Sequence, residues 1–223
     1  MLTQEIAKFI DHTILKPEAT PRDIERLCLE ANQYGFAAVC VNACHVELVK
    51  SLVREDILVA SVIGFPLGAT TTYAKCEETK RAILDGASEI DMVINIGWAK
   101  AGLWQRVADD VRAVVLAAAP VGVKVILETS LLTDEEKALV CSLAKEAGAA
   151  FVKTSTGFGA AGATLADVAL MRRTVGEGFG VKASGGVRTL DALLAMVAAG
   201  ANRIGTSSGV DIVEDSLARN AAT

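Results

Sequence analysis

One pattern recurs along the chain and constrains its fold more than any other feature. A stretch with helical spacing of apolar residues leads to a glycine among small neighbours, and a run of mostly apolar residues follows. Glycine suits the position that closes a helix in the left-handed conformation, and an apolar run suits a strand covered on both faces. The pattern therefore indicates repeated strand and helix units. It occurs at YGFAAVCV, DGASEIDMVI, VGVKVILE, EAGAAFVKTS, EGFGVKAS and AAGANRIGTS.

The pattern predicts eight strands that alternate with amphipathic helices. Thr20 and Pro21 provide a cap and a first-turn proline for one helix, and Thr133 with Glu136 forms a capping box for another. Strands are expected at 10–15, 37–41, 58–63, 89–94, 123–128, 151–155, 180–183 and 203–206. Helices with apolar residues three and four positions apart are expected at 72–85, 105–118, 134–147, 165–174 and 190–199.

Eight strands that alternate with helices can close into a barrel or remain an open, doubly wound sheet. The number of strands favours closure. An open dinucleotide-binding sheet would place GxGxxG after its first strand, whereas KPEATPRD stands there. No linker or break in composition divides the 223 residues. The predicted fold class is therefore α/β, a single-domain (β/α)8 TIM barrel with a short N-terminal helix that occupies residues 1–223.

Composition argues against several classes of protein. The net charge is −5 and no cluster of lysine and arginine occurs, so we expect neither a nucleic-acid partner nor a membrane surface. The N-terminus lacks an apolar stretch of signal-peptide length, and the five cysteines show no paired spacing. These features indicate a cytoplasmic protein with reduced thiols. His12 and His45 are the only histidines and form no metal-binding pattern, so no metal and no cofactor are expected.

Two lysines stand in apolar, strand-like runs, Lys153 in AAFVKTSTG and Lys182 in GFGVKASGG. A lysine inside a buried strand is desolvated, which is costly unless the amine is used. An ammonium beside a second ammonium loses its proton more readily, and the neutral amine is a nucleophile. Each lysine could instead mark a strand end and reach into water. The pair nevertheless provides the first candidates for chemistry.

Carboxylates stand at the ends of other predicted strands, where the active site of such a barrel lies. Asp11 ends the first strand, Asp91 interrupts EIDMVINIG and Glu128 ends VILET. Asp91 is the most informative, because a buried carboxylate needs a neighbouring cation to remain charged. A structural ion pair is the alternative for Asp91. Cys40 could line the pocket, although a small buried residue is the simpler role.

Two glycine-rich loops follow the last two predicted strands. The first is SGGVRT with Gly185 and Gly186, and the second is GTSSG with Gly205, Ser207 and Ser208. Glycines let backbone N–H groups approach a phosphate, serine hydroxyls donate, and a helix that opens at 210 adds its positive end. Either loop alone could be an ordinary turn. Together they favour a phosphate site, which these barrels often place after strands seven and eight.

The motifs IDHT, EIDMVINIG, FVKTSTG, VKASGG and GTSSG span nearly the whole chain in this order, and the set resembles the deoxyribose-phosphate aldolase family. The resemblance implies a metal-independent class I aldolase that reversibly splits 2-deoxy-D-ribose 5-phosphate into acetaldehyde and D-glyceraldehyde 3-phosphate. It implies that Lys153 forms the Schiff base and that Asp91 and Lys182 transfer protons. The residues expected to bind substrate or its phosphate are Gly185, Gly186, Gly205, Ser207, Ser208, Thr156, Asp11 and Cys40.

The expected partners are small molecules, namely the phosphorylated aldehyde and acetaldehyde, and a second copy of the chain in a homodimer or homotetramer. Two features depart from the family. Phe158 stands where some relatives have a phosphate-binding lysine, and the chain ends in SLARNAAT without a C-terminal tyrosine. Two other functions stay open: another Schiff-base aldolase of the phosphate-binding barrels, and a non-catalytic barrel that binds a phosphorylated ligand.

Overall fold

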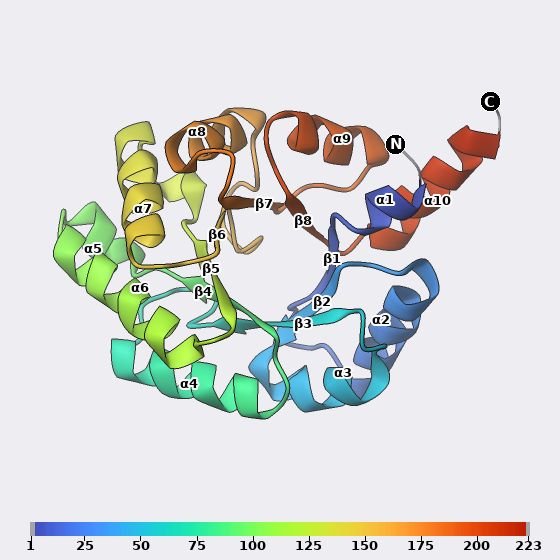
Figure 1. The fold of residues 1–223 in the computed structure, drawn as a ribbon, viewed down its shortest axis with the longest axis horizontal. Helices are drawn as coiled ribbons and strands as arrows, with labels where there is room; N and C mark the ends of the chain where they lie inside the picture. Colours follow the sequence, from blue (N-terminus) through green and yellow to red (C-terminus); the bar gives the residue numbers. More distant parts are fainter. Residues whose placement is uncertain (1–2, 222–223) are drawn as a thin grey trace.

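The computed structural model describes residues 3–221, and its eight strands form a closed barrel in which all strands are parallel (Figure 1). Each strand pairs with the next one in the chain, and the last pairs with the first, where Ile10 lies opposite Ile204. The predicted (β/α)8 barrel is therefore confirmed. The strands are β1 (Ile10–Ile14), β2 (Ala38–Asn42), β3 (Leu58–Ile63), β4 (Glu89–Val93), β5 (Gly122–Ile126), β6 (Phe151–Lys153), β7 (Gly180–Ser184) and β8 (Arg203–Thr206).

The helices form a ring outside the barrel (Figure 1). The short N-terminal helix α1 lies beside the C-terminal helix α10, where the Thr3 and Ser216 hydroxyls hydrogen-bond at 3.0 Å. The α-helices are α1 (Thr3–Ala7), α2 (Pro21–Tyr34), α3 (Val46–Leu52), α4 (Thr72–Leu84), α5 (Ile96–Lys100), α6 (Trp104–Ala118), α7 (Asp134–Glu146), α8 (Leu165–Val175), α9 (Leu190–Ala198) and α10 (Gly209–Ala221). Two 3-10 turns, η1 (Ala43–His45) and η2 (Thr129–Leu131), follow β2 and β5.

The helix signals in the sequence act as predicted. The Thr20 side chain accepts from the Asp23 N–H, and Pro21 is the first residue of α2. Thr133 and Glu136 form the capping box of α7, with the Thr133 N–H 2.8 Å from the Glu136 carboxylate. Gly35 closes α2 with a φ of 68°, a conformation that favours glycine. These caps satisfy backbone groups that a helix end would leave without partners.

The structure differs from the prediction at some element boundaries. Strands β5 and β6 end two residues earlier than expected, at Ile126 and Lys153. Glu128 takes a φ of 57° and turns the chain out of the strand direction. The predicted helices omitted α3 and α5, which have seven and five residues and are too short for the spacing of apolar residues to identify them.

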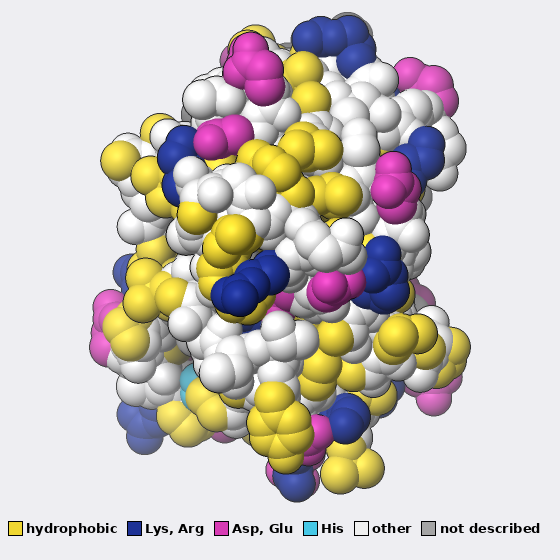
Figure 2. Space-filling view, turned by 90° about the vertical axis from the view of Figure 1, so that its left-hand side faces the viewer, with side chains coloured by type: hydrophobic (Ala, Val, Ile, Leu, Met, Phe, Trp, Pro, Cys, Tyr) yellow, Lys and Arg dark blue, Asp and Glu magenta, His cyan; other side chains and the backbone are white. Residues whose placement is uncertain are grey.

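The apolar core lies mainly between the barrel and its helices, whereas charged side chains occupy part of the barrel interior. Two buried ion pairs also join neighbouring helices on the outside. Lys75 of α4 binds Asp110 of α6, and Lys137 of α7 binds Asp167 of α8, each at 2.6 Å. On the side of the molecule that carries α5, exposed charges of both signs are interspersed with apolar side chains (Figure 2). Within residues 3–221, no helix is both long and apolar enough to span a bilayer.

Candidate active site

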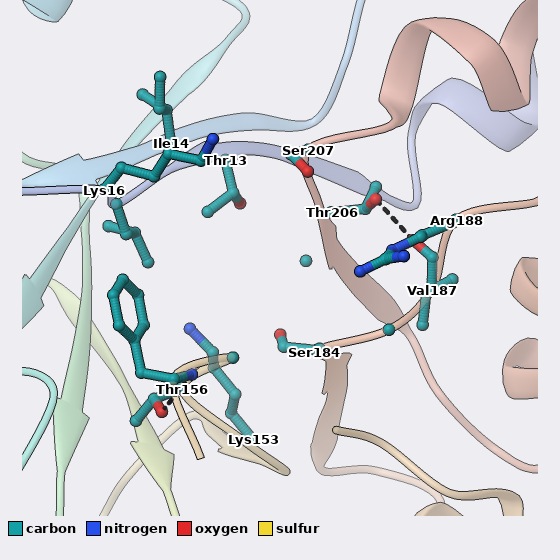
Figure 3. A pocket seen from close by; sticks show the side chains of 16 residues that line it. Thr13, Ile14, Lys16, Lys153, Thr156, Ser184, Val187, Arg188, Thr206 and Ser207 are labelled. Atoms are coloured by element: carbon teal, nitrogen blue, oxygen red, sulfur yellow. Dashed lines mark hydrogen bonds between the residues drawn. The ribbon is translucent and has the colours of Figure 1, made fainter. Parts of the chain in front are cut away.

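A cavity of about 400 Å³ opens at the C-terminal ends of the strands (Figure 3). Its walls come from the ends of β1, β6, β7 and β8 and the loops that follow them, so residues distant in sequence converge there. The lining includes Lys16, Lys153, Thr156, Phe158, Ser184, Gly185, Gly186, Arg188, Gly205 and Ser207. This location is the one that the fold reserves for catalysis.

Lys153, the last residue of β6, provides an amine at the base of this cavity (Figure 3). Its side chain is only 3% exposed, and its Nζ donates a hydrogen bond of 2.8 Å to Asp91 Oδ2. The amine is thus shielded from bulk water and still open to a molecule in the cavity. A lysine in this environment can act as a nucleophile once it has lost its proton.

Asp91 of β4 connects Lys153 to Lys182 of β7. Both amines donate to Asp91 Oδ2 at 2.8 Å, while Lys124 of β5 donates to Oδ1 at 2.9 Å. Asp91 and Lys182 are completely buried and lie beneath the cavity wall. The three residues that the family resemblance assigns to catalysis are therefore brought into one contact group.

Burial and charge have opposite effects on this group. Burial alone would raise the pKa of Asp91, but the cations of Lys124, Lys153 and Lys182 outweigh it and hold that pKa well below its ordinary value. Burial alone would lower the pKa of Lys182, but the carboxylates of Asp11 and Asp91 reverse this and raise it far above the ordinary value. Asp91 therefore stays a carboxylate, and Lys182 stays an ammonium.

The contact group extends deeper into the barrel through residues that the sequence motifs do not mark as functional. Arg203 of β8 donates to Glu89 at 2.8 and 3.1 Å and to Asp11 at 2.6 Å. Lys124 binds Glu89 at 2.7 Å. We call the seven residues the barrel cluster: Asp11, Glu89, Asp91, Lys124, Lys153, Lys182 and Arg203. Lys124 carried the same signal as the two predicted lysines, a lone lysine in the apolar run VGVKVILE.

Asp11 belongs to the barrel cluster and not to the cavity wall. It lies in the first strand, β1, and contacts Lys182 and Arg203, which lie in the last two strands. Burial would raise its pKa, but these two cations lower it to about 2. Cys40 also lies away from the cavity, where it packs against Leu15, Ala60 and Val62, and burial raises the pKa of its thiol. The structure therefore places Asp11 and Cys40 outside the cavity lining.

The two glycine-rich loops form the opposite side of the cavity. Gly185 and Gly186 have φ values of 86° and 81°, so their backbone turns in a way that favours glycine. Gly205 and Ser207 face them from the end of β8. Ser208 is not in the lining, and its N–H donates to Thr206 Oγ1 at 2.9 Å. Backbone N–H groups and hydroxyls gathered in this way can hold an anion.

Two cationic side chains that the sequence motifs do not mark as binding residues also line the cavity. Arg188 comes from the loop after β7, and Lys16 from the loop after β1; both line the cavity (Figure 3). Arg188 stands in the SGGVRT motif, but nothing in the sequence showed that Lys16 would face it across the barrel mouth. A dianion between them would meet two positive charges.

Phe158, which stands where some relatives have a lysine, gives the cavity an apolar edge. Phe158 is half exposed and packs edge-on against Phe65 of the loop after β3, with ring centroids 5.3 Å apart. Behind it, the buried Glu128 carboxylate accepts from the Thr156 N–H at 3.2 Å and also contacts the Thr156 hydroxyl. The Phe158 N–H donates to that hydroxyl at 3.1 Å. Glu128, two residues beyond the end of β5, thus holds the loop that follows Lys153 against the barrel, so its carboxylate has a structural contact.

Known proteins share both the sequence and the fold. A family profile described as DeoC/LacD family aldolase matches residues 6–217. The deoxyribose-phosphate aldolase of Thermococcus gammatolerans is 60% identical, and the alignment covers 99% of this chain and 100% of that protein. The deoxyribose-phosphate aldolase of Thermococcus kodakarensis is also 60% identical, over 96% of this chain and 98% of that protein.

A solved structure agrees with these relatives. The deoxyribose phosphate aldolase of Aeropyrum pernix, described as having a unique tetrameric structure, superposes with a TM-score of 0.89 at 35% identity. The match covers 96% of this chain and 91% of that one. The family profile and the relatives each cover nearly the whole chain. The chain belongs to the DeoC/LacD family of aldolases.

Proposed function

We propose that the chain is a class I aldolase that reversibly cleaves 2-deoxy-D-ribose 5-phosphate into acetaldehyde and D-glyceraldehyde 3-phosphate. The observation that carries the proposal is the Lys153 amine, which faces a cavity bordered by two anion-binding loops and hydrogen-bonds to the buried Asp91. The names of the full-length relatives support the choice of substrate.

The barrel cluster holds one more cationic group than it has carboxylates. Three carboxylates, from Asp11, Glu89 and Asp91, face four cationic groups. Lys124, Lys182 and Arg203 each contact two carboxylates, whereas Lys153 contacts Asp91 alone. When Lys153 is neutral, three cations balance three anions. An excess charge in a buried site is costly, and the amine with the fewest carboxylate contacts is the one that faces the cavity, where it can react as a nucleophile.

The neutral amine can then break the C2–C3 bond of the sugar. Lys153 adds to the C1 carbonyl, and water leaves to give a cationic imine. This cationic imine accepts the electron pair of the C2–C3 bond as that bond breaks, and the imine thereby becomes an enamine. At the same time the C3 hydroxyl loses its proton, and C3 becomes the aldehyde carbon of glyceraldehyde 3-phosphate. The enamine takes a proton at C2, and water releases acetaldehyde and restores the lysine.

The groups that surround the Lys153 amine can carry out the proton transfers of the reaction. Asp91 contacts Lys153 directly and can stabilise the cationic imine as it forms. At rest Lys182 is an ammonium that donates to the same carboxylate oxygen as Lys153, and we assign to this ammonium and carboxylate the proton transfers of the carbinolamine and enamine steps. Such acid–base assistance typically contributes a factor of about 10² to 10⁴ in rate.

Trapping the imine tests the proposal. The chain is incubated with acetaldehyde and sodium borohydride, digested, and analysed by mass spectrometry. We expect a reduced two-carbon adduct on the peptide that contains Lys153. An adduct confined to another lysine would reject the assignment of the nucleophile, and no adduct at all would favour the non-catalytic barrel.

A coupled assay then separates this reaction from that of another Schiff-base aldolase. Release of glyceraldehyde 3-phosphate from deoxyribose 5-phosphate is followed with a chelator present. We expect full activity under chelation, because the proposed chemistry uses no metal. Trapping at Lys153 without release of this product would favour a different phosphorylated substrate.

Three broader expectations remain proposals. We infer that residues 1–223 act as one domain, since the strands of the barrel follow the order of the chain. The tetrameric description of the Aeropyrum pernix relative supports a homo-oligomer, which size-exclusion chromatography with light scattering can measure. Location in the cytoplasm stays a prediction from the sequence.

A further inference from the structure

The hydroxyl groups that line the cavity differ in whether the protein already uses them. Thr13 donates to the Asp11 carbonyl at 2.8 Å, and Thr206 donates to the Val187 carbonyl at 2.6 Å. The Thr156 hydroxyl contacts the Glu128 carboxylate. Ser184 is different: its Oγ is buried and has no hydrogen-bond partner within residues 3–221. A buried hydroxyl without a partner is costly, so a partner supplied by a ligand would remove that cost.

The position of Ser184 makes its hydroxyl available to the substrate. Ser184 lies two residues after Lys182 on β7, so both side chains point to the inside of the barrel and Ser184 is nearer the mouth. It pairs with Gly205 of β8, and a Cβ added at Gly205 would lie 2.4 Å from Ser184 Oγ. Glycine at 205 therefore leaves room for this hydroxyl. Figure 3 shows Ser184 between Lys153 and Arg188, with its oxygen toward the cavity.

The order of groups along the substrate matches this arrangement. In the proposed function, C1 is bonded to Lys153, and the phosphate on C5 lies near Arg188 and Gly186. The hydroxyls on C3 and C4 must lie between these two ends. Ser184 directly precedes Gly185 and Gly186, so it is closest in the chain to the phosphate end. The hydroxyl next to the phosphate-bearing carbon is the one on C4.

We propose that Ser184 hydrogen-bonds the C4 hydroxyl of the sugar phosphate, which is the C2 hydroxyl of glyceraldehyde 3-phosphate, and so selects acceptor aldehydes that carry a hydroxyl beside the carbonyl. This inference rests on the proposed function and extends it to a determinant of specificity. A site built around a hydroxyl discriminates against an analogue that lacks it, because the buried protein group is then left unpaired.

Two acceptors that differ by this hydroxyl test the inference. The addition of acetaldehyde is measured with D-glyceraldehyde 3-phosphate and with 3-oxopropyl phosphate, which keeps the phosphate but lacks the hydroxyl. For Ser184→Ala we expect kcat/KM to fall about tenfold with glyceraldehyde 3-phosphate and less than about twofold with the analogue. An equal loss with both acceptors, or no loss with either, would overturn the role of Ser184.

Ser155→Ala is the matched control. Ser155 Oγ is also buried without a partner among the described residues, but Ser155 is not in the cavity lining. We expect this variant to leave the ratio of kcat/KM for the two acceptors unchanged. Borohydride trapping of acetaldehyde on Lys153 in Ser184→Ala shows that the variant is folded and that its amine reacts. If the unmodified chain adds acetaldehyde to neither acceptor, the proposed function itself fails.

Discussion

Buried lysines occur in two regions of this molecule, between the outer helices and inside the barrel, and the two sets differ in their balance of charge. Between the helices, Lys75 has the carboxylate of Asp110 to itself, and Lys137 contacts both Asp134 and Asp167. Inside the barrel, four cationic side chains share three carboxylates. Burial alone therefore does not distinguish a lysine used for structure from one used for chemistry.

The difference indicates what each lysine can do. A buried ammonium with at least one carboxylate of its own forms a balanced ion pair, and this pair joins two helices. The barrel cluster contains one cation too many, and the excess falls on Lys153, which has the fewest carboxylate contacts and faces the cavity. Reactivity follows from this local imbalance together with access to the cavity.

The largest expected effect comes from removing the excess cation. Lys153→Leu should lower kcat by at least about 10⁴-fold, because it removes the amine that forms the imine in the proposed mechanism. It should leave the free energy of unfolding nearly unchanged, since three carboxylates then balance three cations and leucine suits a buried strand. Steady-state kinetics and chemical denaturation measure the two quantities. A variant that unfolds readily would contradict the charge balance that we infer.

Replacing a lysine between the helices should lower the stability of the chain and leave its turnover nearly unchanged. Lys75→Met leaves Asp110 buried without its cation, which should lower the free energy of unfolding by about 3 to 5 kcal/mol. The kcat of the folded fraction should stay within about twofold of the original, because Lys75 lies outside the cavity lining. Denaturation with guanidinium and kinetics below the unfolding transition provide the measurements.

The double variant Lys75→Met/Asp110→Leu serves as the control for that experiment. Removing both charges should recover most of the lost stability, since no unpaired charge remains. If Lys75→Met instead abolished turnover in protein that remains folded, the division between structural and reactive lysines would fail.

The smallest expected effect is the change in the free energy of unfolding when acid protonates Asp11 inside the barrel. The pKa of Asp11 falls from 3.8 to about 2 on folding, so this carboxylate stabilises the folded chain above pH 3.8 and loses that contribution as the pH falls toward 2. The contribution is about 2 kcal/mol. The stability advantage of the original chain over Asp11→Asn should therefore shrink by about this amount between pH 5 and about pH 2.

The helix pair should respond at the other end of the pH scale. Burial lowers the pKa of Lys137, but Asp167 and Asp134 reverse this and raise it above 10.5. Its contribution is therefore complete below pH 10.5 and is lost as the pH rises through the folded value. Guanidinium unfolding across both pH ranges compares the two regions. An Asp11→Asn difference that stayed constant in acid would contradict the barrel part of this comparison.

Much of the fold could be predicted because each unit carries its own signal. Glycines after helices, apolar runs and caps at Thr20 and Thr133 are local features, and all eight strands lie within two residues of their predicted ends. The end of β5 could not be predicted, because Glu128 leaves the strand conformation to bind Thr156, which follows the next strand. Such a contact depends on the closed barrel.

The site was less predictable than the fold. A lone lysine in an apolar run identified Lys153 and Lys182, and it would have identified Lys124 as well. The sequence did not show how many carboxylates each lysine meets, because Glu89, Arg203 and Asp11 come together only across the barrel. It also gave no sign that Lys16 would reach the same cavity as Arg188.

The pairing of β1 with β8 has a consequence for how activity appears during folding. Lys182 receives its second carboxylate from Asp11, which stands 171 positions earlier in the chain. A chain in which the first and last strands have not yet joined leaves the electrostatic balance of the barrel cluster incomplete. Gain of imine-forming capacity during refolding should therefore report closure of the barrel between its first and last strands.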